Sequence, residues 1–134
     1  MSRTTPKPRP MSPFMIGPYY KPQLTSMLSI THRGMGVFLT AGSLLLVWWL
    51  LAIAAGPEEY ARFAALADGL FGRLVLIALA FGLIYHFFNG IRHMVWDIGK
   101  GLDIPSVYAS GWLMLVTSIV VTAVVVFLAF GGAA

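Results

Sequence analysis

The residues best suited to chemistry lie between His86 and Asp97, in the order His-Phe-Phe-Asn-Gly-Ile-Arg-His-Met-Val-Trp-Asp. This stretch begins inside a long apolar segment and ends among charged and aromatic residues. A histidine without a partner in apolar surroundings costs free energy, so His86 needs a hydrogen bond to a neighbouring helix or a metal to bind. A neutral imidazole is a common metal ligand, and the residue type alone leaves both interpretations open.

The neighbours of His86 favour the second interpretation, with haem as the metal group. They combine aromatic bulk with glycines that would leave gaps for a flat macrocycle, namely Gly82, Tyr85, Phe87, Phe88 and Gly90. The sequence has no cysteine, which excludes disulfides, covalent c-type attachment of haem and iron–sulfur ligation by this chain. Histidine is the obvious remaining ligand, and we predict that His86 is an axial ligand of haem iron.

Two further histidines, His32 and His93, complete the set. His93 follows His86 by seven residues, so on one helix the two share a face about 10 Å apart along the axis. We expect His32 and His93 near the boundary of the apolar segments, where neither easily reaches the far side of an iron at the depth of His86. A six-coordinate haem b would then take its second histidine from another chain.

Arg33 and Ser29 are candidates for binding polar groups at the same boundary. Arg33 is expected beside the haem propionates together with His32 and His93, because a guanidinium suits carboxylates. Ser29 precedes Arg33 by four residues and shares its helical face, so the two could bind a quinone carbonyl. The alternatives are an Arg33 that only sets topology, with its charge among lipid headgroups, and a Ser29 that bonds to the backbone.

Apolar segments must position these residues. Of the 134 residues, 58% are apolar and 10% are charged, and the mean hydropathy of +0.81 is typical of a membrane protein. We expect three membrane-spanning helices, at about residues 34–55, 74–98 and 112–130. The first would extend about 33 Å at ~1.5 Å per residue, which is enough to cross a bilayer core.

The segments between and before the spans are more polar. Residues 1–28 are expected to form a basic, proline-rich cytoplasmic arm with a short approach helix, and residues 29–134 the membrane anchor. A short helix on the membrane surface is expected over residues 58–72. Residues 99–110, which contain Pro105, are expected to form a polar loop.

The distribution of lysine and arginine predicts the orientation of the chain. The N-terminal part through Arg33 and the second connection together carry seven of these residues, against two in the first connection. Positive charge accumulates on the cytoplasmic side, so the N-terminus is expected there and the C-terminus on the far side. The predicted fold class is an all-α integral membrane protein with three transmembrane helices, forming half of a heterodimeric haem-binding bundle in the bacterial cytoplasmic (inner) membrane.

Three ordered motifs together resemble the cytochrome b556 membrane-anchor subunits of succinate dehydrogenase, respiratory complex II. The motifs are Arg-Pro-Met-Ser-Pro at residues 9–13, Ser-Ile-Thr-His-Arg-Gly-Met-Gly at residues 29–36, and the stretch at residues 86–97. The resemblance covers nearly the whole chain. One departure is Phe14, which stands where the family often has a histidine, and it puts only a local contact of the arm in doubt.

The resemblance implies a set of partners and roles. One haem b would lie between this chain and a companion three-helix anchor, with His86 as the axial ligand from this side. Ser29 and Arg33 fall on positions that line a ubiquinone pocket, and His32 with Arg33 lies near the propionates. A flavoprotein and an iron–sulfur subunit would dock on the cytoplasmic face, oxidise succinate and pass electrons to ubiquinone. No nucleic-acid partner is expected.

Other functions fit parts of the same pattern. The chain could be the haem b anchor of a fumarate reductase, which runs the reaction in reverse with menaquinol, although the arm motif favours the ubiquinone-linked type. It could be a non-enzymatic membrane scaffold with a structural histidine, which would be colourless and would not copurify with a dehydrogenase. A homodimer with haem between two His86 side chains is a third arrangement.

Overall fold

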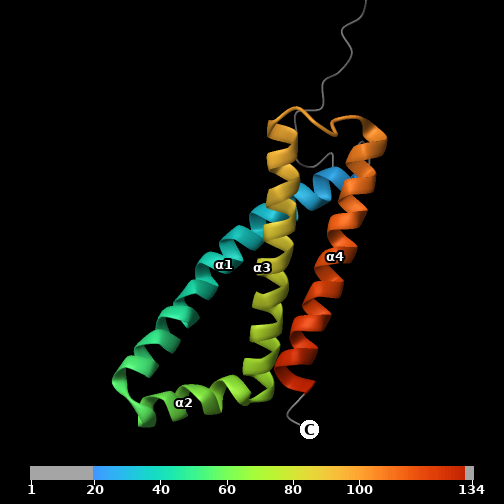
Figure 1. Ribbon diagram of the computed structural model, residues 1–134. Helices are drawn as coiled ribbons and strands as arrows, with labels where there is room; N and C mark the ends of the chain where they lie inside the picture. The colour runs from blue at the N-terminus through green and yellow to red at the C-terminus, as the bar shows by residue number, and fades with distance from the viewer. Residues whose placement is uncertain (1–19, 132–134) are drawn as a thin grey trace, which may run out of the picture.

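The computed structural model describes residues 20–131, which form four helices and no strand (Figure 1). The helices are α1 (Leu24–Ala55), α2 (Pro57–Asp68), α3 (Leu70–Asp97) and α4 (Ile104–Phe130). Of these, α1, α3 and α4 are long and apolar enough to cross a membrane. The expected all-helical class with three long apolar helices is therefore confirmed. The arm motif at residues 9–13 and Phe14 lie outside the described residues.

The first helix is one continuous element of 32 residues. It runs from Leu24 through residues 28 and 29 without a break, so the expected approach segment forms the first turns of the same helix. Gly34, where we expected the span to begin, lies inside it. The helix begins after Gln23, whose backbone N–H donates to the Ser26 hydroxyl at 3.1 Å and so satisfies a group outside the helical ladder.

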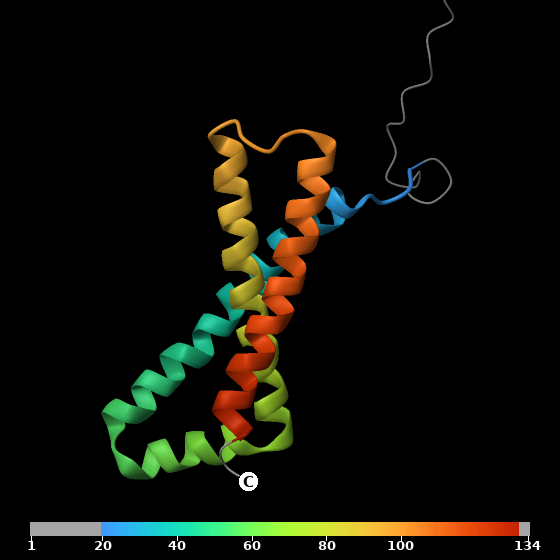
Figure 2. The same cartoon turned by 45° about the vertical axis from the view of Figure 1, so that its right-hand side comes forward.

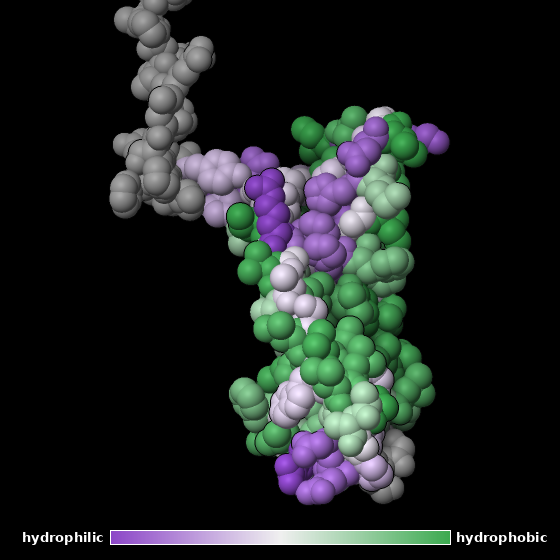
Figure 3. Space-filling view, turned by 90° about the vertical axis from the view of Figure 1, so that its left-hand side faces the viewer, coloured by the Kyte–Doolittle hydropathy of each residue, from purple (hydrophilic) through white to green (hydrophobic). Residues whose placement is uncertain are grey.

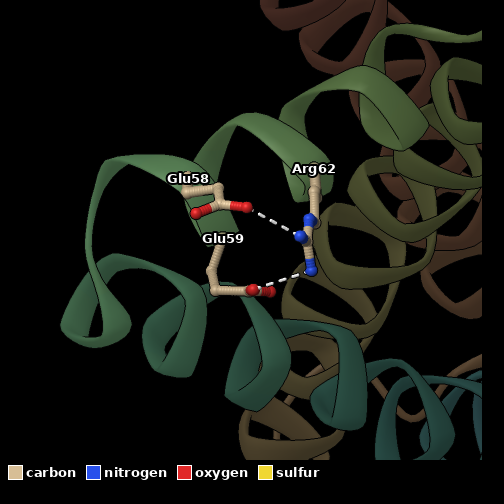
Figure 4. A network of polar contacts seen from close by, with 3 residues as sticks. All are labelled: Glu58, Glu59 and Arg62. Atoms are coloured by element: carbon tan, nitrogen blue, oxygen red, sulfur yellow. Dashed lines mark hydrogen bonds and ion pairs between the residues drawn. The ribbon is translucent and has the colours of Figure 1, made fainter.

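The connection between the first two long helices is itself helical. Pro57 stands at the start of α2, where its missing N–H costs nothing, and Gly69 separates α2 from α3. Arg62 pairs with Glu58 at 2.7 Å and with Glu59 at 2.9 Å on the exposed side of α2 (Figure 4). The expected short helix is present, and its position on a membrane surface remains a prediction.

The expected polar loop over residues 99–110 is wrong for its second half, because α4 begins at Ile104 rather than at Trp112. Pro105 lies in the first turn, where proline favours a helix start instead of blocking it. Asp103 caps this turn by accepting a hydrogen bond from the Ser106 N–H at 3.0 Å. The true turn contains Gly99 and Gly101, both with positive φ, which glycine adopts without strain.

The start of α4 is expected to depend on pH through Asp103. Hydrogen bonds from the Ser106 hydroxyl and then its backbone N–H hold the pKa of Asp103 below the ordinary value of 3.8. A carboxylate whose pKa is lowered by folding stabilises the folded state at pH values above its pKa in the unfolded chain. This stabilisation is lost as the pH falls through its pKa in the folded state. Amide exchange at Ser106, corrected for its intrinsic pH dependence, should therefore accelerate below that pKa.

A matched variant tests this capping role. Asp103→Ala should show the faster Ser106 exchange already at neutral pH and should lose the acid dependence. Exchange at residues in the middle of α4 should stay unchanged in both cases. An acid dependence that persisted in Asp103→Ala would show that another group titrates at this helix start.

The long helices do not pack as a parallel bundle. Helices α3 and α4 lie side by side along most of their length, whereas α1 crosses α3 near the α3–α4 turn and then diverges from it (Figures 1 and 2). Helix α2 bridges the widening gap between the far end of α1 and the start of α3. The beginning of α1 and the α3–α4 turn thus lie at one end of the molecule, and α2 and the end of α4 at the other.

The surface has the pattern of a membrane protein. In the view that faces α1, a broad apolar zone separates hydrophilic residues near the start of α1 and the α3–α4 turn from a second hydrophilic group at the α2 end (Figure 3). Many large apolar side chains in the long helices are exposed, among them Val37, Phe87 and Phe127. Such a surface is stable in lipid, where exposed apolar side chains cost nothing.

Candidate functional site

All three histidines of the chain meet where α1 crosses α3. The ring of His32, from α1, stacks on that of His86, from α3, with centroids 3.9 Å apart and planes 10° apart. His93, two turns further along α3, lies 5.3 Å from the His32 ring in a tilted arrangement. His32 is therefore closer to His86 than the sequence suggested, and it forms the link between the other two imidazoles.

A hydrogen bond fixes the orientation of the His86 ring. Its Nδ1 lies 3.2 Å from the backbone carbonyl oxygen of His32. A carbonyl can only accept, so Nδ1 carries a proton in this hydrogen bond, and in the neutral imidazole Nε2 then keeps its lone pair. Among the described residues, no hydrogen bond occupies Nε2. An imidazole held in this tautomer is prepared to donate its Nε2 lone pair to a metal.

The glycines near His86 play different roles from those expected. Gly82 leaves no gap for a macrocycle, because α1 fills that side: a Cβ there would lie 3.2 Å from the Phe38 ring. The prediction for Gly82 is therefore wrong, and the residue allows α1 to approach α3. Gly36, which the sequence analysis included in the motif at residues 29–36 but gave no role, faces the site directly, since a Cβ there would lie 3.4 Å from Cε1 of His86.

Two buried polar residues of α3 hold α1 in place beside the histidines. The Tyr85 hydroxyl donates to the Leu28 carbonyl oxygen at 3.0 Å, and Nδ2 of Asn89 donates to the same oxygen at 3.3 Å. Tyr85 is 2% exposed and Asn89 is fully buried. Leu28 lies one turn before His32, so these bonds secure the part of α1 that carries the acceptor for His86.

Arg92 extends the polar contacts from α3 to α4. Its NH1 donates to the side-chain oxygen of Asn89 at 3.4 Å, its NH2 to the Val107 carbonyl at 2.9 Å and its Nε to the Ser110 hydroxyl at 3.1 Å. Its Cζ also lies 4.0 Å above the Trp96 ring, in cation–π geometry. Arg92 is 6% exposed, and no acidic residue of the described chain forms an ion pair with it.

Loss of the Arg92 head group is expected to destabilise the helix bundle. Arg92→Met keeps the length of the side chain but leaves the buried Asn89 oxygen without its arginine donor, a cost of about 2 kcal/mol in unfolding free energy. Unfolding of the detergent-solubilised protein by increasing mole fractions of a denaturing detergent measures this cost.

Arg62→Met is the matched control for this comparison. It removes an arginine whose side chain is 65% exposed and whose two ion pairs face outward (Figure 4). Exposed pairs of this kind contribute less than about 1 kcal/mol. Equal destabilisation by the two variants would show that the buried contacts of Arg92 contribute no more to the unfolding free energy than the exposed ion pairs of Arg62.

Arg33 and Ser29 face away from the histidine cluster and towards the surface. Both line an open groove of about 410 Å³ at the start of α1. Its other lining residues are Tyr20 and Pro22 before the helix and Ser26, Met27 and Ile30 within its first turns. Arg33 is exposed and Ser29 is half-buried. The expected shared face is thus observed, and the groove combines a cation and hydroxyls with apolar walls.

The structure separates the predicted site residues into two groups. His32, His86 and His93 form the cluster between α1 and α3, whereas Ser29 and Arg33 form the neighbouring groove. Among the described residues, no three histidine, aspartate or glutamate side chains are arranged to hold a bare metal ion. An iron bound by His86 would need its other ligands from a macrocycle and a second chain.

Sequence reasoning treated Tyr85 as aromatic bulk and Arg92 as a boundary charge, and it gave Asn89 no role. A usable signal was present, because these three residues recur at helical spacing within an apolar segment. Polar residues at such positions are costly unless they face partners inside the bundle. Their common face could have been identified as the one that packs on α1 and α4.

Comparison with known proteins places the chain in a family. The family model described as succinate dehydrogenase/fumarate reductase transmembrane subunit matches residues 5–125. The succinate dehydrogenase cytochrome b556 subunit of Rickettsia prowazekii (strain Madrid E) is 41% identical over 114 residues, covering 85% of this chain and 87% of the relative. The mitochondrial succinate dehydrogenase cytochrome b560 subunit of Homo sapiens is 40% identical over 114 residues, covering 83% and 66%. The chain therefore belongs to the succinate dehydrogenase/fumarate reductase transmembrane subunit family.

Proposed function

We propose that this chain is a membrane-anchor subunit of succinate:ubiquinone oxidoreductase that binds haem b through His86 and forms part of the ubiquinone site. Its similarity to succinate dehydrogenase cytochrome b subunits supports the enzyme complex, and the name cytochrome b implies haem b. The observation that carries the residue assignment is the hydrogen bond from Nδ1 of His86 to the His32 carbonyl, which leaves Nε2 available as a ligand.

The residues at the crossing of α1 and α3 fit a haem site. Haem b supplies one-electron transfer when it is bound. His86 would hold the iron, and the stacked ring of His32 restricts the plane in which the His86 imidazole lies. The second axial histidine would come from a companion anchor subunit. The other two histidines of this chain are clustered beside His86, so neither would lie on the opposite face of a haem that His86 binds.

His32, His93 and Arg33 would hold the haem propionates. His32 supports this role through its Nδ1, which is buried and has no hydrogen-bond partner among the described residues. An unsatisfied buried ring nitrogen costs free energy, and a carboxylate acceptor would remove that cost. His93 lies beside the ring of His32 and would serve the same charged edge, whereas Arg33, in the neighbouring groove, would reach a propionate from the surface side.

Ser29 and Arg33 would bind the head group of ubiquinone in the groove at the start of α1. The Arg33 guanidinium would donate to a quinone carbonyl and stabilise the negative charge that develops there on reduction. The Ser29 hydroxyl would hold the head group by a further hydrogen bond. The mostly apolar lining of the groove, with a few polar groups, suits a ring that carries both carbonyls and methyl groups.

The proposed orientation places the start of α1 and the α3–α4 turn at the cytoplasmic face of a bacterial inner membrane. Five lysine and arginine residues precede or lie at Arg33, which supports this choice. An iron–sulfur subunit would dock on that face and deliver electrons from a flavoprotein that oxidises succinate. The succinate dehydrogenase names of the relatives favour this direction over fumarate reduction.

A spectrum of the purified complex tests the proposal. We expect a reduced-minus-oxidised difference spectrum typical of low-spin haem b, one haem for each copy of this chain, and copurification of a second small anchor, an iron–sulfur subunit and a flavoprotein. A colourless preparation that oxidises succinate with ubiquinone at full rate would refute the haem assignment. Haem in a preparation with this chain as the sole anchor would point to a homodimer.

A further inference from the structure

We infer that Tyr85 and Asn89 are positioning residues for His86, holding α1 so that the His32 carbonyl keeps the proton on Nδ1 of the His86 imidazole. The inference rests on the proposed ligation of haem by His86. It concerns two residues that do not touch the Nε2 atom and that act through the backbone of α1.

The first step of the argument is the placement of the hydrogen bonds between α1 and α3. Within the described residues, all of these side-chain bonds end on two α1 carbonyls one turn apart: Tyr85 and Asn89 donate to Leu28, and His86 donates to His32. The three donors are adjacent or one turn apart on α3, so they form one short row. Movement of the Leu28 carbonyl would therefore also move the His32 carbonyl.

The second step is that, within the described residues, no other hydrogen bond joins α1 to α3 at this level. The remaining contacts are the stacked rings of His32 and His86 and apolar packing, and neither sets the direction of a backbone carbonyl. Beyond the crossing, α1 diverges from α3 and is connected to it through α2 (Figures 1 and 2). Gly36 removes the side chain that could otherwise pack α1 against His86. The position of the His32 carbonyl then depends strongly on the two bonds to Leu28, one turn away.

The third step concerns the orientation of the Asn89 amide. Arg92 has only donors, so its NH1 group at 3.4 Å identifies the facing Asn89 atom as the oxygen. The amide nitrogen must then face Leu28. Because Arg92 is itself held by Val107 and Ser110 of α4, a flip of the amide would break the Arg92–Asn89 contact within α3 as well as the bond to Leu28.

The consequence for the His86 imidazole follows from the chemistry of metal-bound histidine. A hydrogen bond from Nδ1–H to a carbonyl makes Nε2 a stronger electron donor, which stabilises ferric over ferrous iron. Weakening the bond should therefore raise the reduction potential of the haem and loosen its attachment. Tyr85 and Asn89 would in this way tune the haem without contacting it.

The test compares Tyr85→Phe, Asn89→Leu and the double variant in the full complex. Both substitutions keep the approximate shape of the side chain and remove its donor to Leu28. We expect each to raise the haem midpoint potential and to shift the g values of the ferric haem in electron paramagnetic resonance. The double variant should lose haem to an apoprotein acceptor about tenfold faster, as is typical when a partner of a metal-bound histidine is removed.

Thr122→Val is the matched control, because Thr122 is buried but its hydroxyl bonds only to the Ser118 carbonyl within α4. It removes one buried hydroxyl without touching the crossing of α1 and α3. If the double variant matched Thr122→Val in potential, g values and haem loss, the positioning role would be refuted. Should Asn89→Leu fail to assemble, Tyr85→Phe decides by the same comparison, since it removes a single oxygen.

His86→Ala separates this inference from the proposal on which it rests. If His86→Ala leaves the haem spectrum intact, His86 is not the ligand and both fail. If His86→Ala abolishes the spectrum while Tyr85→Phe and Asn89→Leu behave like Thr122→Val, the ligand assignment stands and the positioning role alone is wrong.

Discussion

His86→Ala is expected to abolish the low-spin haem b spectrum of the complex. Nε2 of His86 has no hydrogen bond among the described residues, and its ring is held by His32 through stacking and through the bond at Nδ1. Alanine removes the proposed ligand. Neither neighbouring imidazole is expected to replace it, since the His32 ring is stacked against the face of the His86 ring and His93 lies two turns further along α3. A reduced-minus-oxidised spectrum, together with a haem assay per copy of this chain, measures the loss.

The control for this variant must change α3 without changing the histidines. Leu83→Ala fits, because Leu83 lies on the same helix and is 60% exposed in this chain. It should keep both the spectrum and the haem content. A native spectrum in His86→Ala would mean that another residue binds the iron, and a lost spectrum in Leu83→Ala would mean that α3 tolerates no truncation at this level.

The three long helices were predictable from sequence because the bilayer imposes a minimum length of apolar residues on any span. Their boundaries were less predictable, since the ends depend on single capping residues. Pro105 illustrates this: proline stops a helix in its interior but favours one in its first turn. Here Pro105 favours the helix, because the Asp103 carboxylate caps the first turn of α4, in which Pro105 lies.

The candidate site was predictable in its residue types but not in its arrangement. His86, His32 and Arg33 stood out because polar residues inside apolar segments need partners. The stacking of His32 on His86 depends instead on the crossing of α1 and α3, which is set by Gly36 and Gly82 and by donors to one carbonyl. The spacing of side chains along one helix does not indicate which backbone carbonyl of another helix each side chain will hydrogen-bond.

Arg33→Ala is expected to impair electron transfer to ubiquinone while leaving succinate oxidation by the soluble subunits intact. Arg33 is exposed in the groove that also contains Ser29, so its guanidinium is available to a ligand. Loss of one charge-assisted hydrogen bond to the quinone corresponds to about 2 kcal/mol, or roughly a thirtyfold fall in kcat/KM for the quinone. Steady-state assays with a short-chain ubiquinone, run beside a water-soluble acceptor, separate the two activities.

Two further variants decide whether charge alone or the shape of the guanidinium matters. Arg33→Lys keeps the charge but lacks the planar fork, so it should recover only part of the loss if Arg33 binds a carbonyl directly. Arg62→Ala removes an exposed arginine at the opposite end of the molecule and should leave quinone kinetics unchanged. If Arg33→Ala retained full quinone turnover and affinity, Arg33 would be a charge that sets topology, and the groove at the start of α1 would not be the quinone site.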